Sequence, residues 1–165
     1  MKGDKEQLLT LIAEINDELT NLSILGEAII KITAELEKSG GKEKEYLVES
    51  AALKLHNLYS LFERIFEKFA SEINGGSPTS PDWHMRLLRS MSLEVDGVRP
   101  LVIDEKTYRI LLIYLKFRHV VRSIYGFEID LERLMPLLKE SPFAISIFTR
   151  DIRNFIKFLK VMANA

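Results

Sequence analysis

The 165-residue sequence contains no cysteine. This absence excludes disulfide bonds, thiolate nucleophiles and zinc–cysteine sites, and it fits a reducing cytoplasm, where we expect the protein to reside. No apolar stretch approaches the roughly 20 residues that a transmembrane helix needs. The first residues lead into an amphipathic pattern rather than an apolar core, so we expect neither a signal peptide nor a membrane segment.

Sequence patterns for metal, nucleotide and nucleophile sites are also missing. There are three histidines, at positions 56, 84 and 119, and no two have the i, i+4 spacing of a helical metal pair. The glycine pairs at 40–41 and 75–76 lack the flanking residues of a phosphate-binding loop, and no Gly-x-Ser-x-Gly element occurs. We therefore expect no metal ion and no cofactor.

The composition is that of a folded globular protein. Hydrophobic residues make up 47% and charged residues 28%, and a chain of this length predicts a single domain spanning residues 1–165. Residues 1–103 carry 12 Lys and Arg against 17 Asp and Glu, a net charge of −5, whereas residues 104–165 carry 11 against 7, a net charge of +4. The basic C-terminal half is where a polyanion would bind, although an ordinary variation of surface charge explains the difference equally well.

Apolar residues recur at three- and four-residue steps, which predicts helices throughout. Two long helices, at about 5–38 and 43–73, are separated by Gly40-Gly41, so they must lie antiparallel. Ser80-Pro81 predicts the start of a short helix that ends near residue 91, and 95–103 predicts a loop. Further helices are expected at 104–125, 130–139 and 141–162. The predicted fold class is all-α, an antiparallel up-down bundle with two long N-terminal helices.

One segment of the sequence, residues 117–127 (FRHVVRSIYGF), combines several chemically active side chains. On a helix, Arg118, Arg122 and Tyr125 share one face, and His119 and Ser123 form an adjacent i, i+4 pair. Arginine binds phosphate through charge-assisted hydrogen bonds, and histidine transfers protons near neutral pH. The alternative is that the arginines only cover the bundle surface or pair with acidic residues downstream, Glu128 and Asp130.

This segment and two others resemble HepT-like proteins of the HEPN superfamily. The other two are residues 55–66 (LHNLYSLFERIF) and 82–88 (DWHMRLL), and together the resemblance covers about residues 45–160. It implies a helical bundle that forms a homodimer, with an Arg-x4-6-His motif from each subunit facing a shared cleft. Many HEPN proteins are metal-independent ribonucleases, and HepT proteins are toxins paired with a nucleotidyltransferase antitoxin, which can modify the tyrosine of an Arg-x4-His-x-Tyr motif.

Mapped onto this chain, the motif arginine is Arg118 and the modified tyrosine is Tyr125. The motif histidine is replaced, because Ser123 stands at its position. A serine hydroxyl without an activating base cannot accept a proton at neutral pH, whereas Arg118 and Arg122 can still bind phosphate. His119 lies one turn before Ser123 and is the candidate to replace the missing imidazole.

Other residues of the resembling segments are weaker candidates. Asn57 and Glu63 are expected as polar neighbours of the site, with Glu63 able to pair with an arginine of the motif helix. Trp83 is expected to fill the core rather than to stack on bases.

Three functions remain open from the sequence. The first is a HepT-like toxin that binds RNA and cleaves it, restrained by a nucleotidyltransferase partner. The second is a non-catalytic HEPN-type binding module for such a nucleotidyltransferase, with Tyr125 as the modification acceptor. The third is a helical assembly protein that does not bind nucleic acid.

Overall fold

The computed structural model describes the backbone of residues 2–123 and 129–164, with side chains described for 4–121 and 129–164. The predicted all-α fold is confirmed over this part of the chain. It forms five helices, which are α1 (Lys2–Lys38), α2 (Gly41–Ile73), α3 (Trp83–Met91), α4 (Glu105–Ser123) and α5 (Leu131–Asn164). The helix predicted to reach Tyr125 is described only as far as Ser123.

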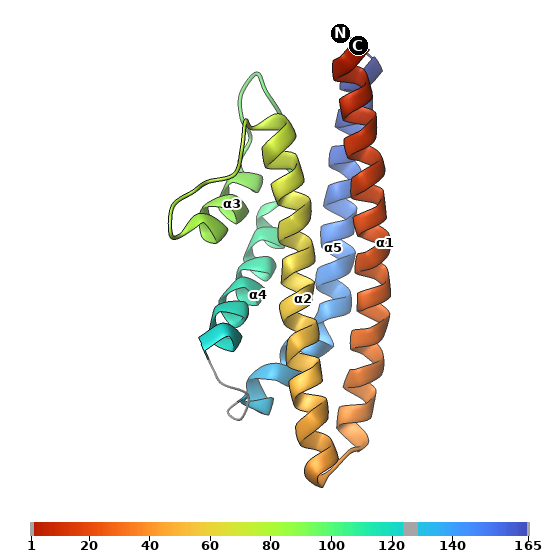
Figure 1. Cartoon of the computed structure of the whole chain (residues 1–165), viewed down its shortest axis with the longest axis vertical. Helices are drawn as coiled ribbons and strands as arrows, with labels where there is room; N and C mark the ends of the chain where they lie inside the picture. The colour runs from red at the N-terminus through yellow and green to blue at the C-terminus, as the bar shows by residue number, and fades with distance from the viewer. Residues whose placement is uncertain (1, 124–128, 165) are drawn as a thin grey trace.

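The three long helices, α1, α2 and α5, lie side by side and form the body of the molecule (Figure 1). α1 runs antiparallel to both neighbours. The turn at Gly40 connects its C-terminal end to α2, and its N-terminal end lies beside the C-terminal end of α5. Along α1 the fully buried residues recur every seven positions, at Ile15, Leu22, Ile29 and Leu36. This spacing places one continuous apolar seam against the neighbouring helices.

The helices α1 and α5 approach each other closely at Gly26. A Cβ atom at this position would lie 2.9 Å from Cδ1 of Ile145. Such a distance is shorter than ordinary van der Waals contact, so a residue with a Cβ atom at position 26 would require the end of the Ile145 side chain to shift.

Two features of the secondary structure differ from the sequence prediction. The segments expected as separate helices, 130–139 and 141–162, form the single helix α5, which contains Pro136 and Pro142. Pro142 has no backbone N–H for the carbonyl oxygen of Leu138, but the hydroxyl of Ser141 donates to that oxygen at 2.8 Å. The hydroxyl of Tyr114 donates to the neighbouring carbonyl of Leu137 at 2.9 Å. These side chains satisfy the carbonyls next to the proline, so the helix bends but does not end.

The short helix α3 begins later than predicted, at Trp83 instead of Pro81. Residues 80–83 form a hydrogen-bonded turn, with the N–H of Trp83 donating to the carbonyl of Ser80 at 2.9 Å. The hydroxyl of Ser80 accepts a hydrogen bond from Arg86 at 3.2 Å and caps no helix. The turn therefore occupies the residues that the cap-and-proline pattern assigned to the helix.

The predicted loop at 95–103 is confirmed, and it folds around Arg99. This side chain is buried and donates hydrogen bonds to the amide oxygen of Asn74 and to three backbone carbonyls, those of Ser90, Leu93 and Pro100. Burial lowers the pKa of the guanidinium. The loop returns the chain to Asp104, which caps α4 as predicted, because its Oδ1 accepts the N–H of Thr107 at 2.7 Å.

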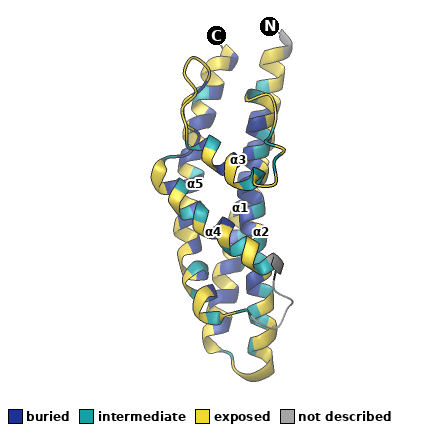
Figure 2. Cartoon of the chain, turned by 90° about the vertical axis from the view of Figure 1, so that its left-hand side faces the viewer, coloured by how far each residue is buried: buried dark blue, intermediate teal, exposed yellow. Residues whose placement is uncertain are grey.

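The two short helices α3 and α4 pack on α2, on the side of the body away from α1 (Figures 1 and 2). In Figure 2 they cross in front of the long helices and carry exposed residues toward the viewer. Buried side chains on their inner sides, such as Leu87, Leu88, Leu111 and Leu115, join the common apolar core. This arrangement places the end of α4 that carries Arg118 beside the middle of α2.

Candidate functional site

The candidate site centres on an ion pair between α4 and α2. Nη1 of Arg118 lies 2.6 Å from Oε1 of Glu63, and the two side chains are only 13% and 6% exposed. A charged pair of this kind, largely removed from water, is held in a fixed geometry because neither charge is stable there without the other. The arginine with which Glu63 pairs is therefore Arg118, the arginine of the motif.

A histidine from the third helix completes the cluster. Nδ1 of His84 lies 2.6 Å from Oε2 of Glu63, and its side chain is 11% exposed. Since an ionised carboxylate can only accept hydrogen bonds, we assign the proton of His84 to Nδ1, which donates a hydrogen bond to Glu63. The contact of 3.4 Å between Nη1 of Arg118 and Nδ1 of His84 is then a close approach of two donors that share one carboxylate.

Aromatic rings surround this cluster. The ring of Trp83 stacks on that of His84, with centroids 3.7 Å apart and planes inclined by 30°. The ring of His119 meets His84 edge-on at 5.7 Å. The guanidinium of Arg118 lies over the ring of Tyr59, 5.8 Å from its centroid, a cation–π geometry. These contacts restrict the orientation of both the imidazole and the guanidinium.

Two buried polar atoms of the site have no hydrogen-bond partner within the described part of the chain. They are the hydroxyl oxygen of Tyr59 and Nε of Arg118. Burial, with a smaller contribution from the Glu63 carboxylate, strongly raises the pKa of Tyr59, so its hydroxyl remains protonated. Unpartnered buried polar groups reduce stability, and they are uncommon in folded proteins.

The cluster opens onto a surface groove of about 620 Å³ between α1, α2, α3 and α4. Glu63, Trp83 and Arg118 form part of its wall, and Asn57 and Glu67 lie along α2 beside them. Partial burial, together with the nearby Glu63 carboxylate, raises the pKa of Glu67. The groove therefore presents two arginines, Arg64 and Arg118, and an aromatic ring among several polar side chains, a composition suited to a nucleotide or another phosphate-bearing ligand.

The structure brings some of the predicted site residues together. Arg118 and Glu63 are in contact, Asn57 is an exposed residue of the groove, and His119 is exposed beside His84. Arg122 and Ser123 belong to the last turn of α4, but their side chains lie outside the described part of the chain, as does Tyr125. Of the two acidic residues proposed as alternative partners of the arginines, Asp130 pairs with Arg133 at 3.7 Å, and Glu128 is outside the described residues.

Two members of the cluster, His84 and Tyr59, were not among the site residues predicted from the sequence. Trp83 is also only partly buried, and it lies at the edge of the core and on the groove instead of inside the core. His84 is 21 positions from Glu63 and 34 from Arg118, so no local spacing links them. The available signal was its position within one of the three segments that resemble HepT-like proteins.

Neither a metal site nor a membrane-spanning element is found in the described residues. Over residues 2–123 and 129–164 there is no group of three or more histidines and acidic residues that could hold a metal ion. None of the helices in this part of the chain is long and apolar enough to cross a bilayer.

The fold and this site together define an α-helical bundle protein with a groove-lining arginine on its fourth helix. A family model described as HepT-like protein matches residues 50–159. The chain belongs to the HepT-like proteins of the HEPN superfamily. The matched range contains Arg118, Glu63 and His84, whereas α1 lies outside it. Comparison with curated proteins and with solved structures gives no significant match.

Proposed function

We propose that this chain is the toxin component of a toxin–antitoxin pair, a cytoplasmic single-domain ribonuclease that cleaves RNA without a metal ion. The observation that supports this function best is the position of Arg118. Its guanidinium is held at the wall of a groove by Glu63 and by the ring of Tyr59. A guanidinium in a partly dehydrated site is the side chain best suited to bind a phosphodiester and to stabilise the charge of its phosphorane.

The charge distribution supports RNA as the ligand. The groove arginine lies on α4, within the C-terminal part of the chain that carries a net charge of +4, and Arg122 follows it by one turn. Phosphate contacts by such residues provide most of the affinity of a protein for RNA without sequence preference, and they make binding strongly dependent on salt.

The active form in this proposal is a homodimer. Apolar side chains line a depression of about 360 Å³ between α4 and the start of α5, and Ile113 and Val120 within it are 53% and 38% exposed. A surface of this kind on the helix that carries Arg118 is suited to contact with a second copy. The family to which the chain belongs implies that such contact places two copies of the motif across one cleft.

The restraint on the toxin is a nucleotidyltransferase antitoxin. In this proposal the partner transfers a nucleotide to the phenol of Tyr125, seven residues after Arg118. The added phosphate would bring negative charge next to the arginines and compete with RNA for them.

A second function is favoured by a different observation, the serine at the position of the motif histidine. If no other group accepts the proton of the RNA 2′-hydroxyl, the chain is a non-catalytic module that binds the nucleotidyltransferase and accepts its modification at Tyr125. The neutralisation of Arg118 by Glu63 also weakens the attraction of the site for a polyanion, which is consistent with a binding module.

The two functions differ in RNA turnover. The test is cleavage of a labelled RNA in the presence of a chelator by the parent chain, Arg118→Ala and Arg109→Ala. Arg109 is the matched control, since it lies on the same helix and pairs with Glu105 on the surface. We expect cleavage by the parent and by Arg109→Ala, and a loss of at least about 100-fold in Arg118→Ala.

Two outcomes would redirect the assignment. Cleavage that persists in Arg118→Ala would remove this arginine from the site. An inert parent chain that gains activity in Ser123→His would identify a binding module with a degenerate centre. Mass spectrometry of the chain co-expressed with a nucleotidyltransferase would then show whether Tyr125 carries a nucleotide.

A further inference from the structure

The proposed cleavage needs a group that accepts a proton from the 2′-hydroxyl, and Ser123 cannot be that group. The serine hydroxyl is far too weak a base at neutral pH. If the chain is the ribonuclease proposed above, another side chain must replace the missing imidazole. The sequence suggested His119, the neighbour of the motif arginine.

The geometry favours a histidine from another helix, His84 on α3. Its imidazole shares the carboxylate of Glu63 with Arg118, at 2.6 Å on each side. One carboxylate therefore fixes the two groups that the reaction requires, a phosphate-binding guanidinium and an imidazole, within 3.4 Å of each other. No rearrangement is needed to place a base beside the arginine.

The hydrogen bond to Glu63 also selects the reactive nitrogen of His84. Because Nδ1 donates to the carboxylate, the lone pair of the neutral imidazole is on Nε2. The same carboxylate stabilises the imidazolium that forms when Nε2 accepts a proton, as in other sites where an acidic residue orients a basic histidine. The ring stacks on Trp83, and its three contacts Trp83, Glu63 and Arg118 all line the groove where a nucleotide would bind.

His119 is less well placed for this role. It is an exposed residue of α4 whose ring meets the edge of the His84 ring, with centroids 5.7 Å apart. Among the described residues, the other charged side chains that interact with His84 are Glu63 and Glu67 on α2 and Arg118 on α4. Of the two histidines, His84 is the one bound to the carboxylate that also holds Arg118.

We infer that His84 is the general base of this chain, with Glu63 as its positioning residue. The 2′-hydroxyl gives its proton to Nε2 of His84, and the 2′ oxygen forms a bond to phosphorus. The bond from phosphorus to the 5′ oxygen breaks, and its electron pair stays on that oxygen. A water molecule protonates the 5′ oxygen, and the imidazolium returns its proton to the resulting hydroxide. The products are a 2′,3′-cyclic phosphate and a 5′-hydroxyl.

The test compares RNA cleavage, with chelator, by His84→Gln, His119→Gln and His56→Gln, which changes the remaining histidine of the chain. We expect His84→Gln to lower kcat by about 100-fold or more, with RNA affinity changed less than threefold. His119→Gln should lose less than tenfold, and His56→Gln should cleave like the parent chain. A loss in His119→Gln equal to that in His84→Gln would overturn the choice of histidine.

A structural role for His84 is separated from a chemical role by imidazole rescue. His84→Ala should regain at least about tenfold in rate when imidazole is added, since free imidazole can occupy the space of the deleted ring and accept the proton. Failure of imidazole to restore any activity in a folded variant, with an unfolding midpoint close to that of the parent, would overturn the proposal.

The outcomes also distinguish this inference from the proposed function. Cleavage by the parent that is lost in Arg118→Ala but retained in His84→Gln would leave the nuclease intact and overturn only the role of His84. A parent chain that binds RNA but never cleaves it would overturn the nuclease activity and the general base together.

Discussion

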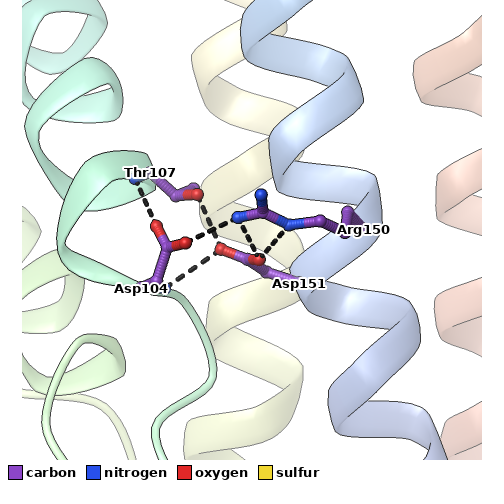
Figure 3. A network of polar contacts seen from close by, with 4 residues as sticks. All are labelled: Asp104, Thr107, Arg150 and Asp151. Atoms are coloured by element: carbon purple, nitrogen blue, oxygen red, sulfur yellow. Dashed lines mark hydrogen bonds and ion pairs between the residues drawn. The ribbon is translucent and has the colours of Figure 1, made fainter.

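Two buried polar clusters attach α4 to the rest of the molecule, and they differ in how completely their atoms are paired. One lies at the start of α4 and contains Asp104, Thr107, Arg150 and Asp151 (Figure 3). The other is the cluster of Arg118, Glu63 and His84 near the opposite end of the helix. Each is centred on a carboxylate that is at most 7% exposed.

In the first cluster both oxygens of the buried carboxylate are fully used. Oδ2 of Asp151 accepts the N–H of Asp104 at 3.0 Å and the hydroxyl of Thr107 at 2.6 Å. Oδ1 accepts Nε of Arg150 at 2.9 Å and lies 2.7 Å from its Nη2. The donors belong to the first turn of α4 and to α5 itself, so the cluster clamps the helix start to α5.

In the second cluster the pairing is incomplete. Nε of Arg118 and the hydroxyl of Tyr59 have no acceptor or donor within the described part of the chain, and Arg118 and Glu63 line a groove. A protein that needed this cluster only for stability would gain by replacing these groups with apolar ones. The comparison thus separates a fully paired cluster that joins α4 to α5 from a cluster beside a groove that keeps unpaired polar atoms within the described residues.

The largest expected effect on stability is that of Asp151→Ala. This change leaves the N–H of Asp104 and the buried hydroxyl of Thr107 without an acceptor, so we expect the free energy of unfolding to fall by about 3 kcal/mol. Urea unfolding followed by circular dichroism measures the loss. RNA cleavage per folded molecule should stay within twofold of the parent, and a selective loss of cleavage would show that the two clusters are not separate in function.

Glu63→Gln should have a smaller effect on stability and a larger one on function. The amide oxygen of glutamine can still accept one hydrogen bond, but it no longer balances the charge of Arg118, so we expect a loss of about 2 kcal/mol. RNA affinity at low salt should rise, because the negative charge beside the guanidinium is removed. Filter binding across a salt series checks this, and an unchanged affinity would place Glu63 outside the RNA-binding site.

Lowering the pH should reduce the stability that the first cluster provides, by less than Asp151→Ala or Glu63→Gln reduces the free energy of unfolding. Partial burial alone would raise the pKa of Asp104, but the hydrogen bonds from Thr107 and the charge of Arg150 outweigh it and hold the pKa below the ordinary value of 3.8. The ionised carboxylate therefore stabilises the fold fully above that value, and this contribution disappears as the pH falls through the lowered pKa.

Asp104→Asn isolates this contribution, since asparagine also caps helices but carries no charge. We expect the unfolding temperature of the parent to exceed that of Asp104→Asn at pH 7, and the difference to shrink between pH 4 and pH 2. Thermal unfolding at several pH values provides the measurement. A difference that is independent of pH would mean that hydrogen bonding, and not charge, accounts for the role of Asp104.

The cap at the start of α4, which belongs to the first cluster, could be predicted from the sequence, whereas the contact between Glu63 and His84 in the second cluster could not. The cap at Asp104 and the lengths of α1 and α2 depend on neighbouring residues, so local patterns predicted them correctly. The continuity of α5 could not be predicted, because it requires the Ser141 hydroxyl to satisfy the carbonyl that Pro142 leaves without a donor. A cap-and-proline pattern normally starts a helix.

The same limit applies to the candidate site. Arg118 was found because its motif lies within a single helix, whereas His84 and Glu63 meet only through the packing of α3 against α2. Helical periodicity shows which face of a helix is apolar, but it does not show which polar residue of one helix will lie opposite another. The histidine that the motif lacks was therefore sought on the motif helix, at His119, and not on α3.

The smallest expected effect is that of removing a single hydroxyl from each cluster. Thr107→Val deletes a hydroxyl that is hydrogen-bonded to Asp151 at 2.6 Å, and we expect a loss of about 1.5 kcal/mol. Tyr59→Phe deletes a buried hydroxyl that has no hydrogen-bond partner among the described residues, so the free energy of unfolding should change by less than about 0.5 kcal/mol or increase. Urea unfolding of the two variants side by side measures the difference. A loss in Tyr59→Phe as large as that in Thr107→Val would mean that the Tyr59 hydroxyl is satisfied in solution, and the contrast in pairing between the two clusters would then rest on Nε of Arg118 alone.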